Sequence, residues 1–469
     1  MNFRILFTLS ALSLTACATK SEKKSPNIIV VFADDQGYED LGCYGSPLIK
    51  TPCVDKMATE GLRLTDFYAS SSVSSASRAG LLTGKMNHRN SVKGVYFPND
   101  RGMDTDQVIV AETLKEQGYA TACFGKWHLG DVDGSLPTDR GFDEYFGIPY
   151  SNDMYPSSVH TFSKDIVLRN GYTPEQLKGD MLHYDKYKDD RRMLNKRLWG
   201  KLPLFEGKEV IEYPCDQSTL TRRYFDRTID FIKKSKDTPF FVFLTPAMPH
   251  IPLFASEQFA GKSARGLYGD VVEEIDWNMG RLLDYLDKEG LSENTLVVYA
   301  TDNGPWLGKQ DRSGSAGIFR DGKFSVYEGG VRVPCIIRWL GTVPAGKESQ
   351  ALVSSLDFFP TFMHYAGETN VERDLDGNSI HAFFENPDKG SGRNEYYYVH
   401  DGKVRGVRQG EWKLLPNTGL NKMPKVPSPE LYNLRTDPGE RVNLITQHPE
   451  IVARLQSLID AEAKREKTF

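Results

Sequence analysis

Apolar runs rich in β-branched and aromatic residues alternate along the chain with amphipathic stretches, and Gly, Pro or Asp bounds each run. This alternation predicts an α/β fold with a mainly parallel sheet that is covered on both faces. The strongest runs lie at 27–32, 119–124, 240–244 and 296–299. Because ligands of open α/β sheets bind beyond the carboxyl ends of the strands, the residues that follow these runs are the candidates for chemistry.

The pattern changes after about residue 375. Short antiparallel strands are expected at 396–399, 404–407 and 412–415. An amphipathic closing helix is expected at 449–464. The sequence therefore predicts a main domain over 27–375 and a smaller C-terminal α+β subdomain over 376–469.

The N-terminus carries the apolar run 5–14 behind Arg4, and no run in the chain approaches the roughly 20 apolar residues that cross a bilayer. We interpret 1–17 as an export signal. It ends in Leu-Thr-Ala-Cys17, which resembles the lipobox of bacterial lipoproteins, where the Cys is lipidated. The alternative is an ordinary cleaved signal with a chance Cys. With the polar stretch 18–26 as a tether, these features indicate a protein exported from a bacterial cell, either periplasmic or an outer-membrane lipoprotein, whose only link to the membrane is the lipid.

Charge and cysteine content exclude several classes of protein. The 469 residues include 58 Lys and Arg against 63 Asp and Glu, and the basic residues are scattered, so we expect no nucleic-acid partner. Apart from Cys17 there are five cysteines and no CxxC pair, which argues against a disulfide framework or a thiolate zinc site. A bridge between Cys43 and Cys53 stays open.

Acidic and amide side chains follow two of the strongest runs. Asp34 and Asp35 come directly after 27–32, and Asp302 and Asn303 come shortly after 296–299. Each pair alone is typical of a solvated turn. Together at one sheet edge, three carboxylates would repel each other unless a hard cation lay between them, and oxygen ligands favour Ca²⁺ or Mg²⁺ over zinc.

Basic side chains follow the other two runs. Lys126 and His128 come after 119–124, and His250 comes after 240–244. A lone His is more often structural, but at one rim two imidazoles can move protons and a Lys can hold an anion. The Ser-rich segment 70–84 predicts a loop capping a short helix that ends at Gly84. Ser74 would lie at the helix start, which favours anions, with Arg78 one turn on.

These residues resemble a known family. Ser74-Ser-Ala-Ser-Arg78 followed by Leu-Thr-Gly84 resembles the signature of formylglycine-dependent (type I) sulfatases in its serine form, in which the first residue is oxidised to formylglycine. The resemblance continues in order through the blocks 34–37, 125–130, 301–304 and 322–334. Blocks 140–143 and 147–150 resemble the arylsulfatase A and N-acetylgalactosamine-6-sulfatase branch. The chain departs from the commonest pattern with Ser at 74 and Ala at 76, and the Ser implies an anaerobic-type radical maturase as a partner.

The resemblance implies an alkaline phosphatase-like fold, with a large mixed, mostly parallel sheet. It implies a metal, usually Ca²⁺ with Mg²⁺ as the alternative, bound by Asp34, Asp35, Ser74 as formylglycine, Asp302 and Asn303. It also implies that charge on the sulfuryl group is neutralised by Arg78, Lys126 and Lys323. His250 would protonate the leaving oxygen, and His128 would help to remove the second hydroxyl proton of the formylglycine hydrate.

The expected substrate is a sulfated carbohydrate, such as a galactan or glycosaminoglycan fragment. The polar stretch 151–213 is long for a connection, and we interpret it as a solvated surface excursion. The alternative is that it walls the substrate pocket, where Asp153, His160 or a Lys or Arg of this stretch would select the sugar; His400 is a further candidate. Two other functions stay open: a phosphodiesterase or phosphonate hydrolase of the same superfamily, and a non-catalytic lipoprotein that binds sulfated glycans.

Overall fold

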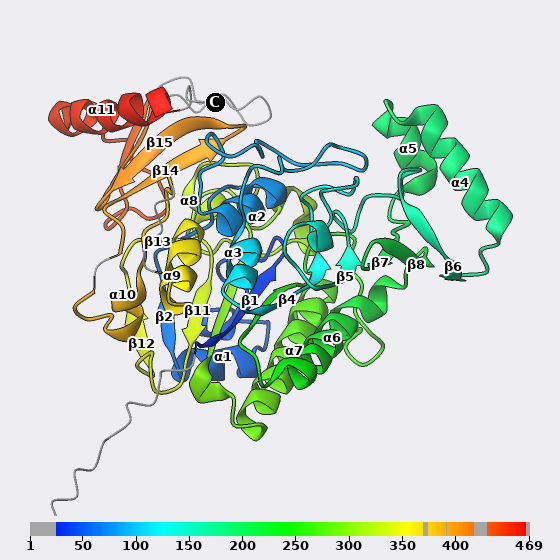
Figure 1. Ribbon diagram of the computed structural model, residues 1–469. Helices are drawn as coiled ribbons and strands as arrows, with labels where there is room; N and C mark the ends of the chain where they lie inside the picture. The colour runs from blue at the N-terminus through cyan, green and yellow to red at the C-terminus, as the bar shows by residue number, and fades with distance from the viewer. Residues whose placement is uncertain (1–24, 369–373, 391, 417–428, 466–469) are drawn as a thin grey trace, which may run out of the picture.

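The computed structural model describes residues 25–368, 374–390, 392–416 and 429–465 (Figure 1). Its centre is an 11-stranded sheet in the order β12-β2-β11-β10-β1-β9-β4-β5-β7-β8-β6. The four strongest runs form the middle of this sheet and are parallel: β10 (Thr295–Thr301), β1 (Asn27–Ala33), β9 (Phe240–Thr245) and β4 (Ala120–Lys126). The predicted large, mixed and mostly parallel sheet is confirmed. The predicted signal and Cys17 lie outside the described residues.

Strands of both directions extend this centre. β5 (Glu144–Ile148) is parallel to β4, whereas β11 (Cys335–Arg338) is antiparallel to β10. The outer strands are β2 (Leu62–Leu64), β12 (Lys347–Ser349), β7 (Leu204–Glu206), β8 (Glu209–Tyr213) and β6 (Thr161–Leu168). β3 (Phe67–Tyr68) and β13 (Val353–Ser354) form a separate two-stranded sheet.

Helices cover both faces of the sheet, which explains why its central strands are apolar throughout. Ile28 and Val30 of β1 face one core, and Ile29 and Val31 face the other. The first core is covered by α2 (Ser74–Thr83), α3 (Val110–Glu116), α9 (Phe358–Tyr365) and α10 (His381–Glu385). The second is covered by α1 (Pro52–Thr59), α6 (Leu220–Ser235) and α7 (Leu267–Lys288).

The C-terminal residues form the expected small antiparallel sheet. Its strands are β14 (Glu395–His400), β15 (Lys403–Gln409), β16 (Trp412–Leu415) and β17 (Glu430–Asn433). The closing helix α11 (Pro449–Arg465) buries Leu455 and Ile459 against this sheet. The short helix α8 (Glu328–Val331) carries the buried Glu328, which accepts a hydrogen bond from Lys413 of β16. The domain boundary at residue 375 stays a prediction.

The stretch 151–213 is more than the solvated excursion that we expected. It contains β6, β7 and β8 with the helices α4 (Pro174–Tyr187) and α5 (Arg191–Leu198), which project at the end of the sheet away from the C-terminal sheet (Figure 1). Tyr155, Tyr184, Leu194 and Leu198 form a small apolar core of their own. A few large apolar side chains that pack together are therefore enough to order a segment that is otherwise polar.

Two further expectations concern anchoring and thiols. Within the described ranges, every helix is too short or too polar to span a bilayer. Cys43, Cys53, Cys123, Cys215 and Cys335 are free thiols, so the bridge between Cys43 and Cys53 that the sequence left open is not formed.

Candidate active site

The acidic cluster lies where β1 and β10 end. The two strands pair in register up to Ala33 and Thr301, so the residues that follow them are neighbours. Carboxylate oxygens of Asp34, Asp35 and Asp302 lie within 4.8 Å of one another, and all three side chains are buried. Asn303 Nδ2 donates to Asp35 Oδ1 at 2.7 Å, which leaves Asn303 Oδ1 as a further acceptor in the cluster.

Ser74 is the first residue of α2, and its side chain faces this cluster. Its Oγ lies 3.0 Å from Asp34 Oδ1 and 3.3 Å from Asn303 Oδ1, and the residue is 1% exposed. The N-cap residue is Val73, without a side-chain cap, so the expectation that the Ser-rich loop caps the helix is wrong. The hydroxyl is directed to the acidic cluster instead.

Three buried cations balance the three carboxylates. Arg78 Nη2 donates to Asp302 Oδ2 at 2.9 Å, Lys126 Nζ to Asp34 Oδ2 at 2.5 Å, and Lys323 Nζ to Asp35 Oδ2 at 2.7 Å. Burial alone would raise the pKa of Asp34, but Lys126, His250 and Arg78 outweigh burial and lower it.

Carboxyl and amide oxygens around one point suit a hard divalent cation such as Ca²⁺ or Mg²⁺. The donor set of Asp34, Asp35, Asp302 and Asn303 therefore fits the metal that the resemblance implies.

His128 is held as a neutral proton acceptor. Its Nε2 lies 3.0 Å from the carbonyl oxygen of Tyr96, which only accepts hydrogen bonds, so Nε2 carries the proton. Its buried Nδ1 has no hydrogen-bond partner among the described residues. Burial, helped by the charge of Lys126, lowers the pKa of His128 well below its usual value. The imidazole therefore offers a free lone pair at neutral pH.

His250 has the opposite orientation. Its Nδ1 lies 3.0 Å from Asn152 Oδ1 and 2.5 Å from the carbonyl oxygen of Ile251, so Nδ1 donates. Its Nε2 lies 3.2 Å from Ser151 Oγ and 3.5 Å from Asp35 Oδ2. With Nδ1 held by these acceptors, Nε2 is the ring nitrogen that faces Ser151 and Asp35.

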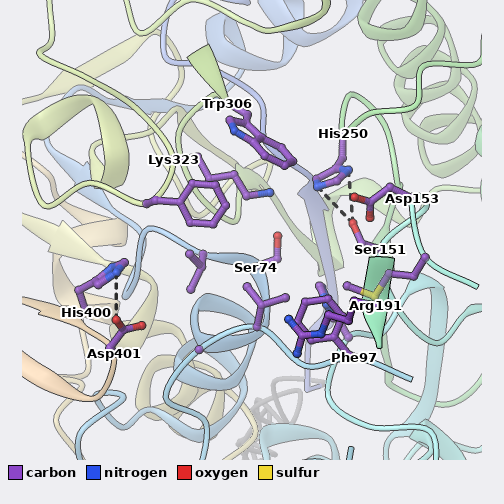
Figure 2. Close-up of a pocket in the computed structure, with 16 residues that line it drawn as sticks. Ser74, Phe97, Ser151, Asp153, Arg191, His250, Trp306, Lys323, His400 and Asp401 are labelled. Carbon is purple, nitrogen blue, oxygen red and sulfur yellow. Dashed lines mark hydrogen bonds and ion pairs between the residues drawn. The ribbon is translucent and has the colours of Figure 1, made fainter. Parts of the chain in front are cut away.

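A cavity of about 450 Å³ opens over Ser74 (Figure 2). Its walls come from the main domain, the stretch 151–213 and the C-terminal sheet. The lining residues are Val73, Ser74, Gly94, Val95, Phe97, His128, Ser151, Asp153, Met154, Arg191, His250, Trp306, Lys323, Phe324, His400 and Asp401. This volume is in the range of small-molecule sites and suits a sugar.

Two of the three residues that were expected by name to select the sugar line this cavity, and the third does not. Asp153 and His400 line the cavity. His160 does not, and this expectation is wrong: its buried ring lies 2.7 Å from Asp131 Oδ2 and 3.0 Å from the hydroxyl of Tyr150. A buried carboxylate and a hydroxyl hold the imidazole behind the pocket wall.

Several lining residues escaped the sequence analysis. Ser151, and Asn152 behind it, follow the end of β5, so the strand-end argument applied to that weaker run would have found them. Trp306 comes shortly after Asn303 and lies against Lys323. Arg191 is one of the basic residues of 151–213 that the sequence analysis considered only as a group, and Phe97 lies on a separate loop that no local pattern marks.

Comparisons with known proteins point to one family. The family model described as Sulfatase matches residues 26–368, and that of the N-sulphoglucosamine sulphohydrolase C-terminal region matches 314–465. Human arylsulfatase A is 34% identical, over 96% of this chain and 90% of its own. The N-acetylgalactosamine-6-O-sulfatase of Bacteroides thetaiotaomicron is 31% identical, over 96% and 97%. The crystal structure of Ps i-CgsB in complex with k-i-k-neocarrahexaose superposes with a TM-score of 0.76 at 30% identity, covering 94% of this chain and 93% of that one.

Proposed function

The chain belongs to the sulfatase family of sulfuric ester hydrolases, and we propose that it removes sulfate from a carbohydrate with residue 74, oxidised to formylglycine, as the nucleophile. One observation carries the proposal. Ser74 lies at the floor of a sugar-sized cavity, at hydrogen-bond distance from two of the proposed metal ligands. Addition of water to the formylglycine aldehyde gives a geminal pair of hydroxyls, which a plain serine lacks.

The proposed metal ligands are Asp34, Asp35, Asp302, Asn303 and the side chain at position 74. Their oxygen-only donor set favours Ca²⁺ or Mg²⁺. Once bound, such an ion would polarise an oxygen of the sulfate ester.

The protein's own side chains have separate tasks in this proposal. Arg78, Lys126 and Lys323 neutralise the sulfuryl oxygens, since each cation already reaches the carboxylates around Ser74. His250 protonates the leaving oxygen from Nε2. His128 accepts a hydroxyl proton at residue 74 on its unpartnered Nδ1.

A galactan or glycosaminoglycan fragment is the proposed substrate class. This follows the relatives, one of which is named for N-acetylgalactosamine and another was crystallised with neocarrahexaose. Asp153 and His400 are the proposed hydroxyl-binding residues, because both line the cavity and a carboxylate or an imidazole can accept from sugar hydroxyls.

Export and maturation complete the proposal. The signal 1–17 with Cys17 supports export from a bacterial cell as a periplasmic or outer-membrane lipoprotein. Ser at position 74 supports maturation by an anaerobic-type radical enzyme.

The test is co-expression with such a maturase, followed by mass spectrometry of the peptide that contains Ser74 and a desulfation screen on defined sulfated sugars. We expect the peptide to lose two hydrogen atoms and the matured protein to release sulfate, with Ser74→Ala as the inactive control. A chain that stays unconverted, or binds sulfated glycans without releasing sulfate, would support the non-catalytic alternative. Preferential hydrolysis of a phosphodiester or phosphonate would support the second alternative, a phosphodiesterase or phosphonate hydrolase of the same superfamily.

A further inference from the structure

We propose that Arg191 binds a second anionic group on the substrate, either a carboxylate or another sulfate, so that the enzyme prefers multiply charged glycans. The proposal deepens the sulfatase function above and rests on it. Arg191 begins α5 and lines the same cavity as Ser74 and His250. The inserted stretch 151–213 would thus supply specificity rather than only a wall.

Within the described part of the chain, the guanidinium of Arg191 has no anionic partner. Among the residues that the structure describes, no carboxylate oxygen lies within 4.0 Å of it. Lys323, the other Lys or Arg that lines the cavity, is engaged, since it binds Asp35. The donors of Arg191 are therefore available to a ligand.

The guanidinium is also held in place. Its Cζ lies 3.3 Å from the centre of the Phe97 ring, a stacked contact that leaves the N–H edges free. The Phe97 loop is fixed in turn: Phe97 N donates to Asp100 Oδ2 at 2.7 Å, and Asn99 N donates to Asp131 Oδ1 at 3.0 Å.

One residue supports both partners of this stack. The hydroxyl of Tyr184 donates to the carbonyl oxygen of Pro98 at 3.1 Å, next to Phe97. The Tyr184 side chain also packs in the small core with Leu194 and Leu198 of α5. Because the loop and the helix share this support, the spacing between Phe97 and Arg191 is set before a ligand arrives, which reduces the entropy lost on binding.

Arg191 does not belong to the cations that surround the acidic cluster, which are Arg78, Lys126 and Lys323. Figure 2 shows Arg191 against Phe97 on one side of Ser74, with Lys323 and Trp306 on the other. The sulfate to be cleaved would lie at Ser74, so an anion at Arg191 belongs to another part of the sugar or to the next unit. A planar guanidinium fork matches the paired oxygens of both carboxylate and sulfate.

Equilibrium binding to the unmatured chain tests the proposal without turnover. The probes are galactose 6-sulfate and N-acetylgalactosamine 6-sulfate, each beside its 4,6-disulfate, and N-acetylgalactosamine 6-sulfate joined to glucuronic acid. We expect each doubly charged probe to bind about three- to tenfold more tightly than its singly charged counterpart. This gain lies between that of an exposed ion pair and that of a fully charge-assisted hydrogen bond. Arg191→Ala should bring this ratio near one, and Arg191→Lys should restore part of it. A larger gain in affinity for the disulfates would identify the second anion as a sulfate, and a larger gain for the glucuronate probe would identify it as a carboxylate.

Arg192→Ala is the matched control, since Arg192 is the exposed neighbour that does not line the cavity. It should keep the wild-type ratio, and the ratio should fall with added salt because Arg191 is exposed. Equal binding of singly and doubly charged probes, or an unchanged ratio in Arg191→Ala, would overturn the proposal. A retained binding preference in a matured chain that releases no sulfate would instead count against the sulfatase function alone.

Discussion

Replacing His250 with alanine should reduce kcat/KM far more for a sulfated sugar than for an aryl sulfate. A sugar alcohol leaves as a strongly basic alkoxide and needs a proton, whereas a nitrophenolate leaves readily without one. In the proposed mechanism, Nε2 of His250 protonates the leaving oxygen. Asn152 Oδ1 and the Ile251 carbonyl hold the proton of Nδ1, and Nε2 lies 3.5 Å from Asp35 Oδ2.

The magnitude follows from the task. General acid catalysis contributes roughly 10²- to 10⁴-fold, which corresponds to about 3 to 5 kcal/mol of transition-state stabilisation. His250→Ala should lose that factor on the sulfated sugar and less than about tenfold on 4-nitrophenyl sulfate. The assay is kcat/KM on both substrates with matured protein, after mass spectrometry has verified equal formylglycine content.

Lys126→Ala and Arg78→Ala are the controls. Both side chains reach the carboxylates around Ser74, where the sulfuryl oxygens common to both substrates would lie. They should impair the two substrates by similar factors. If His250→Ala did the same, His250 would hold the sulfuryl group and the role of proton donor would be refuted.

Three other predictions concern the nucleophile, the metal and the C-terminal interface. Ser74→Ala should abolish turnover yet move the thermal midpoint by less than about 4 °C, since one hydrogen bond contributes about 1 kcal/mol; residual wild-type turnover would exclude residue 74. Chelation should remove activity, and Ca²⁺ or Mg²⁺ should restore it better than Zn²⁺. The circular dichroism spectrum should stay unchanged on chelation because Arg78, Lys126 and Lys323 compensate the charges of the carboxylates. Full activity in protein that elemental analysis shows to be metal-free would contradict this. At the interface between the C-terminal sheet and α8, the buried Glu440 pairs with Lys413 and accepts a hydrogen bond from Glu328 N. Burial raises the pKa of Glu440 to about 7 despite the nearby Lys413, so its contribution to stability is present below about pH 4.5 and lost as the pH rises through about 7. Glu440→Gln should therefore gain thermal stability relative to the wild type between pH 5 and pH 8, and a constant difference in midpoint would refute the shift.

The strand-end side chains could be predicted because parallel pairing is a simple rule. Ala33 lies beside Thr301 in parallel register, so Asp34 and Asp35 lie close to Asp302 and Asn303. This follows from strand pairing alone. The same rule brought Lys126 and His250 to this edge. The state of His128 could not be predicted, since its tautomer depends on a carbonyl of Tyr96 from a separate loop.

The stretch 151–213 shows where local pattern fails. Asp153 and His160 are close in sequence, yet Asp153 lines the cavity while His160 turns away to Asp131. A buried imidazole follows its hydrogen-bond partner, and that partner belongs to another segment. Among the Lys and Arg residues of this stretch, Arg191 could be singled out only when the fold set it against Phe97.

The charges of the site explain why an acidic cluster can serve an anionic substrate. The formal charges of Asp34, Asp35 and Asp302 are cancelled by those of Arg78, Lys126 and Lys323, all of them buried. The chain alone therefore offers a sulfate ester no net attraction at Ser74. A bound divalent ion would leave the site with two excess positive charges, and in a buried site such charges are weakly screened. Metal and sulfate binding are then thermodynamically linked, so each should tighten the other by the same factor. On this argument the three paired cations stabilise the acidic cluster while the metal is absent. A bound metal would then give the site the positive charge that attracts sulfate.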